Sequence, residues 1–269
     1  MSQKGSGGVF GPNHGKTPPD PFCASDHYSY SAYADPAMAT GFDAKRFGGP
    51  IGQMLLEDQE RVLAHFLGDV SNRRVLDVAT GTGRAALALA KRGAIVTGID
   101  ASREMLTVAR TRAADAGLSM EFAEGDAHAL AFPDREFDAV VCLRMLMHVP
   151  DWRKALSELC RVTRHRLVFD YPAMGSTAAL QVMWRRTALM LGRKVEAYRV
   201  FRAGDIAREL DRHGFRVTST HKQFVLPIAL HKAVGSSAFT RNVESIFAGA
   251  GLLRLAGSPV TIAAERCAS

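Results

Sequence analysis

Between residues 74 and 172, short apolar segments alternate regularly with segments whose apolar residues recur at helical spacing. The short segments are the predicted strands 74–79, 94–100, 119–126, 137–146 and 166–172. The predicted helices between them are 84–93, 102–117 and 151–163. Apolar strands that alternate with helices indicate a mostly parallel sheet with helices on both faces. The sequence therefore predicts a doubly wound, Rossmann-like α/β fold.

The segment before this alternation predicts a tail, a lid and a helix. Residues 1–26 are rich in Gly, Pro, Ser and Lys without hydrophobic periodicity, which predicts a disordered tail. An aromatic patch follows, made of Tyr28, Tyr30, Tyr33, Phe42 and Phe47. From Ile51 onward apolar residues recur at helical spacing, and Pro50 occupies the place of a helix N1 proline. We expect residues 27–70 to form a lid and helix beside a core domain at 71–269.

The segment after Pro172 departs from the alternation. Helical spacing continues over 174–192, and a basic link then leads to a predicted helix at 204–214. We interpret residues of about 174–202 as a helical cap inserted after the fifth strand. The remaining predicted elements are a strand at 215–222, helical pieces around 229–235 and 240–255, and a last strand at 258–266.

The composition is that of an ordinary globular protein, with 47% hydrophobic and 23% charged residues. No apolar run approaches the ~20 residues of a membrane-spanning helix, and no secretory signal is visible. The four cysteines lack metal-type spacing, so we expect free thiols in a reducing cytoplasm and no metal site. The net charge of +7 arises mainly between residues 151 and 223, which keeps anionic lipid, nucleic acid and acidic substrates open as partners.

The first predicted strand runs directly into a glycine-rich turn, ATGTGRAA, that leads into a helix. Such a turn lets the backbone approach a ligand closely. Gly81, Gly83 and Ala86 also satisfy the G-x-G-x-x-G/A dinucleotide fingerprint, and Asp100 lies where a ribose-binding carboxylate is expected. The turn alone is therefore compatible with an NAD-type cofactor.

Three further features favour S-adenosylmethionine (SAM). Asp77 places a carboxylate near the end of the first strand, where the ammonium group of an amino-acid cofactor would be its partner. The third strand ends in Gly125-Asp126-Ala127, which supplies a carboxylate and backbone groups for an adenine edge. The fourth strand is followed by the switch-point loop HVPDW. These elements lie at successive carboxyl ends of the sheet, the edge at which such folds bind ligands.

As a set, VLDVATGTGRAAL, VTGIDAS, EGDAHALAFPDREFDAVV and MLMHVPDWRKALSELCRV resemble the class I SAM-dependent methyltransferases. The similarity is greatest to the broad bacterial type that includes ubiquinone and menaquinone C-methyltransferases. It runs from about Ile51 to Val168 and more loosely to Lys222. The resemblance implies SAM as the cofactor of a Rossmann-like domain.

The resemblance also implies a role for each matching position. The residues beside the methionine moiety would be Asp77, Ala79, Gly81 and Gly83. Those at the ribose and adenine would be Asp100, Ala101, Asp126 and Ala127. Those facing the sulfonium would be Leu143 and Arg144.

The sequence departs from this family in the turn before the fifth strand, where RVTRHRL replaces a Pro-Gly-Gly turn. It also lacks the NPPY-type motif of amino-group methyltransferases. The proton acceptor therefore has to be selected from the residues near the fourth and fifth strands. His148 is the first candidate because imidazole titrates near neutrality, and Asp170 and Tyr171 follow.

These observations predict a methyltransferase that acts on a hydroxyl or activated carbon of a small or lipid-like acceptor, of the quinone or secondary-metabolite type. The alternatives are an RNA methyltransferase and a non-catalytic SAM-fold partner subunit. The arginines carry no interleaved aromatic stacking motif, which disfavours nucleic acid as a partner. The intact glycine-rich turn and acidic positions disfavour the non-catalytic alternative. Peripheral membrane contact and the oligomeric state stay open.

Overall fold

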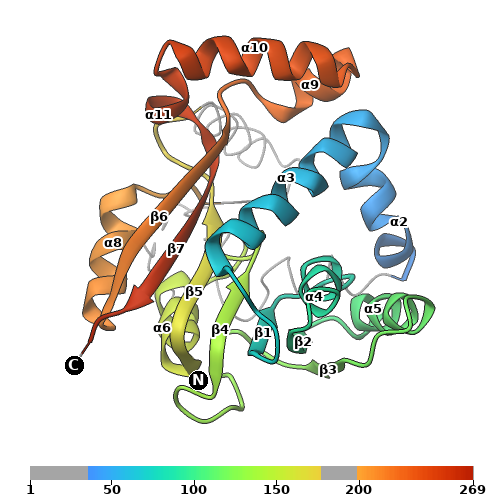
Figure 1. Ribbon diagram of the computed structural model, residues 1–269, viewed down its shortest axis with the longest axis vertical. Helices are drawn as coiled ribbons and strands as arrows, with labels where there is room; N and C mark the ends of the chain where they lie inside the picture. Colours follow the sequence, from blue (N-terminus) through green and yellow to red (C-terminus); the bar gives the residue numbers. More distant parts are fainter. Residues whose placement is uncertain (1–35, 177–198, 269) are drawn as a thin grey trace, which may run out of the picture.

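The computed structural model describes residues 36–176 and 199–268. Within them one seven-stranded sheet has the order β3-β2-β1-β4-β5-β7-β6 (Figure 1). The strands are β1 (Arg74–Val78), β2 (Ile95–Asp100), β3 (Glu121–Glu124), β4 (Phe137–Cys142), β5 (Thr163–Tyr171), β6 (Phe215–Phe224) and β7 (Ser258–Arg266). Strands β1 to β5 pair in parallel, whereas β7 is antiparallel to both β5 and β6. The predicted mostly parallel sheet is confirmed.

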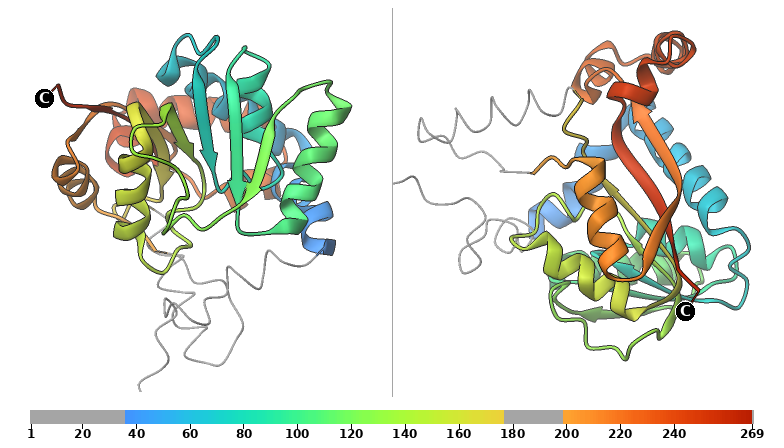
Figure 2. Two further views of the ribbon diagram at one scale, coloured as in Figure 1. Left: turned by 90° about the horizontal axis from the view of Figure 1, so that it is seen from below. Right: turned by 90° about the vertical axis from the view of Figure 1, so that its left-hand side faces the viewer.

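Helices cover both faces of the sheet. They are α2 (Pro36–Phe47), α3 (Gly49–Leu67), α4 (Arg84–Ala90), α5 (Arg103–Asp115), α6 (Trp152–Val162), α8 (Ala203–Arg212), α9 (Ile228–Val234), α10 (Ser237–Gly249) and α11 (Leu252–Ala256). Val75 of β1 packs in a buried cluster with α3 and α4, whereas its neighbour Leu76 packs in a second cluster with α6 and α8. The right-hand view of Figure 2 shows α6 and α8 on the side of the sheet opposite α3. This two-sided burial explains why the strands are apolar runs rather than alternating patterns.

The structure corrects the predicted ends of three strands. The strand expected at 119–126 is limited to β3, and the strand expected at 137–146 ends at Cys142. The fifth strand begins earlier than expected, at Thr163, because Thr163 pairs with Phe137 of β4. The Thr163 hydroxyl also donates to the Leu159 carbonyl (2.6 Å), which ends α6 and starts β5 without a separate turn.

The predicted helix from Ile51 is α3, and Pro50 lies in its first turn as expected. Phe42 and Phe47 of the aromatic patch belong to α2. The predicted tail 1–26, the three tyrosines of the patch and most of the predicted cap at 174–202 lie outside the described residues. At the base of that cap, the Met174 N–H donates to the Phe201 carbonyl (2.9 Å), so the two described ends of the segment lie side by side.

The predicted helical segment between the sixth and last strands consists of α9, α10 and α11. These helices lie beyond the upper end of the sheet in Figure 1, and α9 and α10 contact α3. Within residues 36–176 and 199–268, no helix combines the length and the apolarity that crossing a bilayer requires. From this position the three helices α9, α10 and α11 extend the molecule beside the carboxyl edge of the sheet, where the cavities described below lie.

Gly83, which precedes α4, provides a test of how closely α4 and α5 pack. Its φ is +80°, and an added Cβ would lie 2.9 Å from Leu87 Cδ1 and 3.0 Å from Ala109 Cβ. We expect Gly83→Ala to lower the free energy of unfolding by about 1–3 kcal/mol, because the conformation and the packing both oppose a methyl group. Urea unfolding measures this change.

Gly204→Ala is the matched control. Gly204 lies in the first turn of α8, and an added Cβ would meet no atom within 4 Å. This variant should be more stable than the parent by roughly 0.4–1 kcal/mol, because alanine restricts the unfolded chain. A Gly83→Ala protein as stable as the Gly204→Ala protein would contradict the packing described here.

Candidate functional site

The turn between β1 and α4 has an unusual backbone. Ala79 and Gly81 both have positive φ, at +57° and +55°. The Thr80 N–H donates to the Ile99 carbonyl at 2.9 Å, which ties the turn to β2. Positive φ is uncommon for alanine, and such strain clusters at ligand-binding sites. The backbone of Ala79 therefore marks this turn as a candidate site.

Asp100 ends β2 and joins three segments of the site. One carboxylate oxygen accepts from the Gly81 N–H (2.8 Å) and the other from the Ser102 N–H (2.9 Å). Burial raises the pKa of this carboxyl, while these backbone hydrogen bonds lower it. Each carboxylate oxygen has a second lone pair, so Asp100 can accept further hydrogen bonds from a ligand.

A cavity of about 1010 Å³, called here the first cavity, lies at the carboxyl ends of β1 to β4. The predicted residues that line it are Ala79, Gly81, Asp100, Ala101, Asp126, Ala127, Leu143, Arg144 and His148. Lining residues that the sequence analysis did not select include Phe42, Arg46, Arg84, Met105, His128 and Val149. One cavity thus brings together most of the predicted cofactor-binding residues.

Asp77 does not line the first cavity and lies beneath the glycine-rich turn. Its carboxylate accepts from the Thr80 hydroxyl (2.7 Å) and from the Ala86 N–H. Burial raises the pKa of Asp77 to about 7, with a smaller upward contribution from Asp100. In the structure Asp77 therefore positions the turn against α4, and its implied contact with the methionine moiety stays a prediction.

Two other predicted site residues also lie away from the first cavity. Gly83 faces Ala109 of α5, so that it allows α4 and α5 to pack closely. Tyr171 is buried in an aromatic cluster with Phe169 and Phe201, at ring-centroid distances of 6.3 and 6.0 Å. Burial raises the pKa of its phenol, as expected for a side chain in the apolar core.

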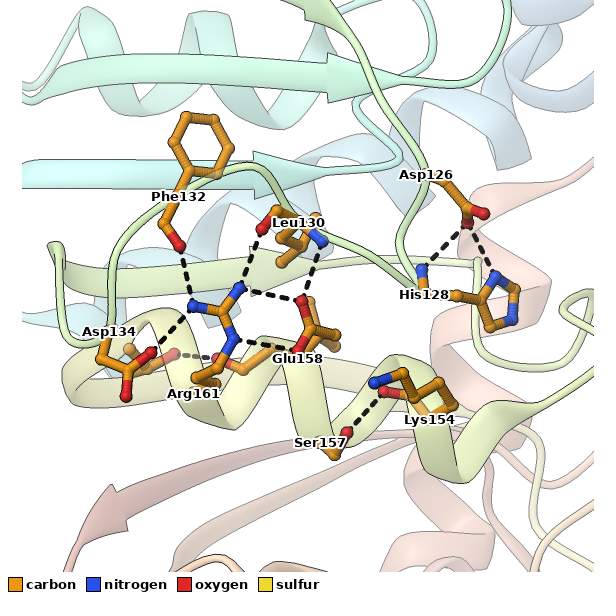
Figure 3. Close-up of polar contacts among 11 residues, drawn as sticks. Asp126, His128, Leu130, Phe132, Asp134, Lys154, Ser157, Glu158 and Arg161 are labelled. Atoms are coloured by element: carbon orange, nitrogen blue, oxygen red, sulfur yellow. Dashed lines mark hydrogen bonds and ion pairs between the residues drawn. The ribbon is translucent and has the colours of Figure 1, made fainter.

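The loop that carries Asp126 is held in place by α6 (Figure 3). Arg161 donates to the carbonyls of Phe132 (2.7 Å) and Leu130 (2.8 Å). Glu158 accepts from the Leu130 N–H at 2.8 Å and pairs with Arg161. The Asp126 carboxylate accepts from the backbone N–H of His128 (2.9 Å) and also contacts Nδ1 of the His128 imidazole (2.7 Å). Sequence reasoning missed Arg161 and Glu158, because no local pattern assigns helix residues to a loop about 30 positions earlier.

Arg84, the first residue of α4, supplies a cation that the sequence analysis also missed. Its guanidinium carbon lies 3.5 Å from the Phe47 ring centroid, and its Nε lies 3.3 Å from an Asp43 carboxylate oxygen. Burial lowers the pKa of Arg84 to about 10. In the described part of the chain its buried Nη1 has no hydrogen-bond partner. A buried donor without an acceptor suits a ligand carboxylate, and a basic residue directly after the glycine-rich turn was the available signal.

Asp43 anchors α2 over the first cavity. Its carboxylate accepts from the Thr82 hydroxyl at 3.1 Å and pairs with Arg112 of α5 as well as with Arg84. Phe42 and Arg46 of the same helix line the cavity. One acidic side chain therefore connects α2 to the glycine-rich turn, to α4 and to α5.

The end of β4 joins the first cavity to a second one. Arg144 has a positive φ of +63°, and its N–H donates to Asp170 Oδ1 at 2.5 Å. The second cavity, of about 1050 Å³, shares Arg46, Leu143 and Arg144 with the first and is also lined by Asp170. Burial raises the pKa of Asp170, and the Arg144 charge lowers it. The two leading proton-acceptor candidates thus face different cavities, His148 the first and Asp170 the second.

Comparison with known proteins identifies a family to which the central part of this chain is similar. Residues 75–166 match the family described as Methyltransferase domain. These residues contain β1 to β4 and most of the first cavity. The segment is a class I SAM-dependent methyltransferase domain. The match ends within β5, so it does not include the second cavity's residues from β6, β7 and α9.

Individual relatives agree with this assignment. A demethylmenaquinone methyltransferase of Thermus thermophilus is 49% identical over 92 residues, which are 34% of this chain and 42% of that protein. A ubiquinone biosynthesis O-methyltransferase of Alkalilimnicola ehrlichii is 42% identical over 103 residues, 38% of this chain and 42% of that protein. The chain thus spans less than half the length of these curated relatives.

The magnesium protoporphyrin IX methyltransferase of Synechocystis PCC 6803, solved with bound SAH, has the same fold. The TM-score is 0.62 at 20% sequence identity, and the alignment covers 88% of this chain and 99% of the other. The shared fold therefore extends well beyond the methyltransferase domain match, through the strands that follow β5.

The raised pKa of Asp77 predicts a pH-dependent stability difference. The folded protein holds this proton more tightly than the unfolded chain, so the Asp77 contribution to stability falls as pH rises from about 4 to about 7. Asp77→Asn has no such proton. The stability of Asp77→Asn relative to the parent should therefore rise with pH in this window, by at most about 1.4 kcal/mol per pH unit.

Urea unfolding at pH 5 and pH 7 measures that difference. Asp115→Asn is the control, because it makes the same substitution at an exposed position at the end of α5. Parallel pH profiles for the parent and Asp77→Asn would show that the buried carboxyl titrates normally.

The Asp43 contacts predict that α2 opens more often when this carboxylate is removed. Charge-assisted hydrogen bonds contribute roughly 1.5–3 kcal/mol, so Asp43→Ala should speed hydrogen exchange of the α2 amides about ten- to a hundredfold. Mass spectrometry of the peptide covering 36–47 measures this rate. Lys45→Ala, which removes an exposed charge from the same helix, should leave it within a few-fold of the parent. Equal rates in the two variants would contradict the anchoring role of Asp43.

Proposed function

We propose that this chain binds SAM in the first cavity and transfers its methyl group to a hydroxyl or activated carbon of a small or lipid-like acceptor. The observation that carries the proposal is the donor and acceptor set of the cavity. It combines a half-buried carboxylate, Asp100, with a buried guanidinium nitrogen of Arg84 that has no acceptor within the described residues. A ligand that fits must present hydroxyl donors to the Asp100 carboxylate and an anionic group to the Arg84 guanidinium.

SAM has both groups on one molecule. Its ribose hydroxyls would donate to the free lone pairs of Asp100, and its amino-acid carboxylate would accept from Arg84. The turn at Ala79 and Gly81 would lie along the methionine moiety, and Asp126 with Ala127 would lie at the adenine. Asp77 would act from beneath the turn, through its hydrogen bonds to Thr80 and Ala86.

The sheet supports SAM over a dinucleotide. In the dinucleotide-binding fold a second parallel half of the sheet follows the switch point and carries the second nucleotide. Here the corresponding half contains β7, which is antiparallel between β5 and β6. The cavity therefore offers a nucleoside site on one half of the sheet only, which suits a mononucleoside cofactor with an amino-acid tail.

The sulfonium of bound SAM supplies an activated methyl group, so the protein has to align the acceptor and remove its proton. Leu143 and Arg144 lie where the two cavities meet, and they would position the acceptor. Buried His148 would accept a proton on the side of the first cavity. Asp170 would do so on the side of the second cavity, where burial raises the pKa of its carboxyl.

The names of the relatives support a quinone-type acceptor. One is named a demethylmenaquinone methyltransferase and another a ubiquinone biosynthesis O-methyltransferase. We therefore propose an acceptor with a ring that is hydroxylated or activated at carbon.

Cofactor binding tests the proposal directly. Calorimetry of the full chain should show binding of SAM and SAH in the micromolar range and none of NAD. Asp100→Ala should weaken SAM binding roughly ten- to a hundredfold, because a hydrogen bond to a charged group contributes about 1.5–3 kcal/mol. Asp115→Ala is the control and should bind SAM like the parent. Tighter binding of NAD than of SAM, or unchanged affinity in Asp100→Ala, would overturn the assignment of the first cavity.

A further inference from the structure

The second cavity lies beside the first at the carboxyl edge of the sheet. Its lining includes Asp170 at the end of β5, His221 near the end of β6 and Thr261 near the start of β7. Residues of α3 and α9 complete it. Because Leu143 and Arg144 line both cavities, a molecule in the second lies next to one in the first.

Much of the lining is apolar. Leu55, Val62 and Leu63 of α3, together with Phe47 and Ile228, contribute hydrophobic surface. Burial of apolar ligand surface against such side chains stabilises binding by about 25 cal/mol per Å². The second cavity therefore suits a molecule with a ring or hydrocarbon body.

The charged residues of the lining are mostly cationic. Lys45, Arg46, Arg144 and Lys232 contribute positive charge from α2, the β4 loop and α9. Lys232 donates to the Arg46 carbonyl at 2.7 Å, which places its ammonium at the carboxyl end of α2. Burial lowers the pKa of Lys232, and repulsion from Arg46 and Arg144 lowers it further. Lys232 thus lies close enough to Arg46 and Arg144 for their charges to repel its own.

The acidic residues of the second cavity are already engaged. Asp58 of α3 accepts from Gln223 Nε2 (2.8 Å), contacts His221 Nε2 (3.1 Å) and pairs with Arg61. Asp170 accepts from the Arg144 N–H. Among residues 36–176 and 199–268, no carboxylate lies within ion-pair distance of Lys45, Arg144 or Lys232. The positive charge of the lining is therefore balanced only in part by the protein.

We propose that the second cavity binds the methyl acceptor, and that this acceptor is a ring or hydrocarbon compound carrying one anionic group, a carboxylate or a phosphate. The inference rests on the proposed methyltransferase function and deepens it. The apolar side chains hold the body of the acceptor, Lys45 and Lys232 hold its anionic group, and the reacting atom faces the first cavity past Arg144. Most of the predicted cap at about 174–202 lies outside the described residues, whereas this cavity is formed by described ones.

The experiment compares matched aromatic probes by calorimetry on the full chain saturated with SAH. The anionic probes are 1-hydroxy-2-naphthoate and 1-naphthyl phosphate, and the neutral probe is 1-hydroxy-2-naphthamide. We expect at least one anionic probe to bind about tenfold or more tightly than the amide, a difference of about 1.4 kcal/mol. Binding should be additive with SAH rather than competitive.

Three variants locate the anion. Lys45→Gln and Lys232→Gln should each reduce the preference for the anionic probe, and the double variant should abolish it while SAH affinity stays unchanged. Lys45 is exposed, so its single variant keeps the test valid if loss of the Lys232 contact to α2 destabilises the fold. Lys91→Gln removes an exposed charge outside both cavities and should keep the full preference.

The outcomes separate this inference from the proposed function. Equal affinity for the amide and both anions, competition of the probes with SAH, or an unchanged preference in the double variant would overturn the acceptor pocket and leave SAM binding intact. Absence of SAH binding with the anion preference retained would instead overturn the proposed function, and with it the assignment of the bound anion as a methyl acceptor.

Discussion

The hydrogen bond from the Gly81 N–H to the Asp100 carboxylate connects the ends of two adjacent parallel strands. It fixes the glycine-rich turn over β2, and the second carboxylate oxygen positions Ser102 at the start of α5. The same carboxylate lines the first cavity. One half-buried acid thus joins the glycine-rich turn to the start of α5 and also lines the first cavity.

Contacts from distant parts of the chain hold the remaining sides of the first cavity. Asp43 joins α2 to Arg84 and Arg112, and Arg161 of α6 fixes the loop that carries Asp126. Each of these contacts uses a charged side chain that is at most about half exposed, where an ion pair is screened less than at a free surface. The parallel sheet supplies a common edge, and these side chains give that edge its shape.

The sequence was sufficient to predict the fold because β1, β2 and β4 are largely buried apolar segments, and each is followed by a helix. It also predicted most of the first cavity, since the carboxyl ends of parallel strands converge at one edge. It was insufficient for the end of β4, because residues 143–146 are mostly apolar and read as strand. There the Arg144 backbone turns to a positive φ, and its N–H donates to the side-chain carboxylate of Asp170 in β5. Arg112 and Asp43 are 69 positions apart, and no local pattern reports such a pair.

The residues of the two cavities are completed at different points along the chain, because the lining of the second includes residues of β7, the last strand. All residues that line the first cavity lie between Phe42 and Val149, whereas the lining of the second extends to Thr261. During synthesis the first cavity is therefore complete in sequence while β5 still has an open edge and β6 has no partner strand in the sheet. Open edges pair readily with other chains. A nascent chain thus holds all the residues that line the first cavity more than a hundred residues before it holds all those that line the second.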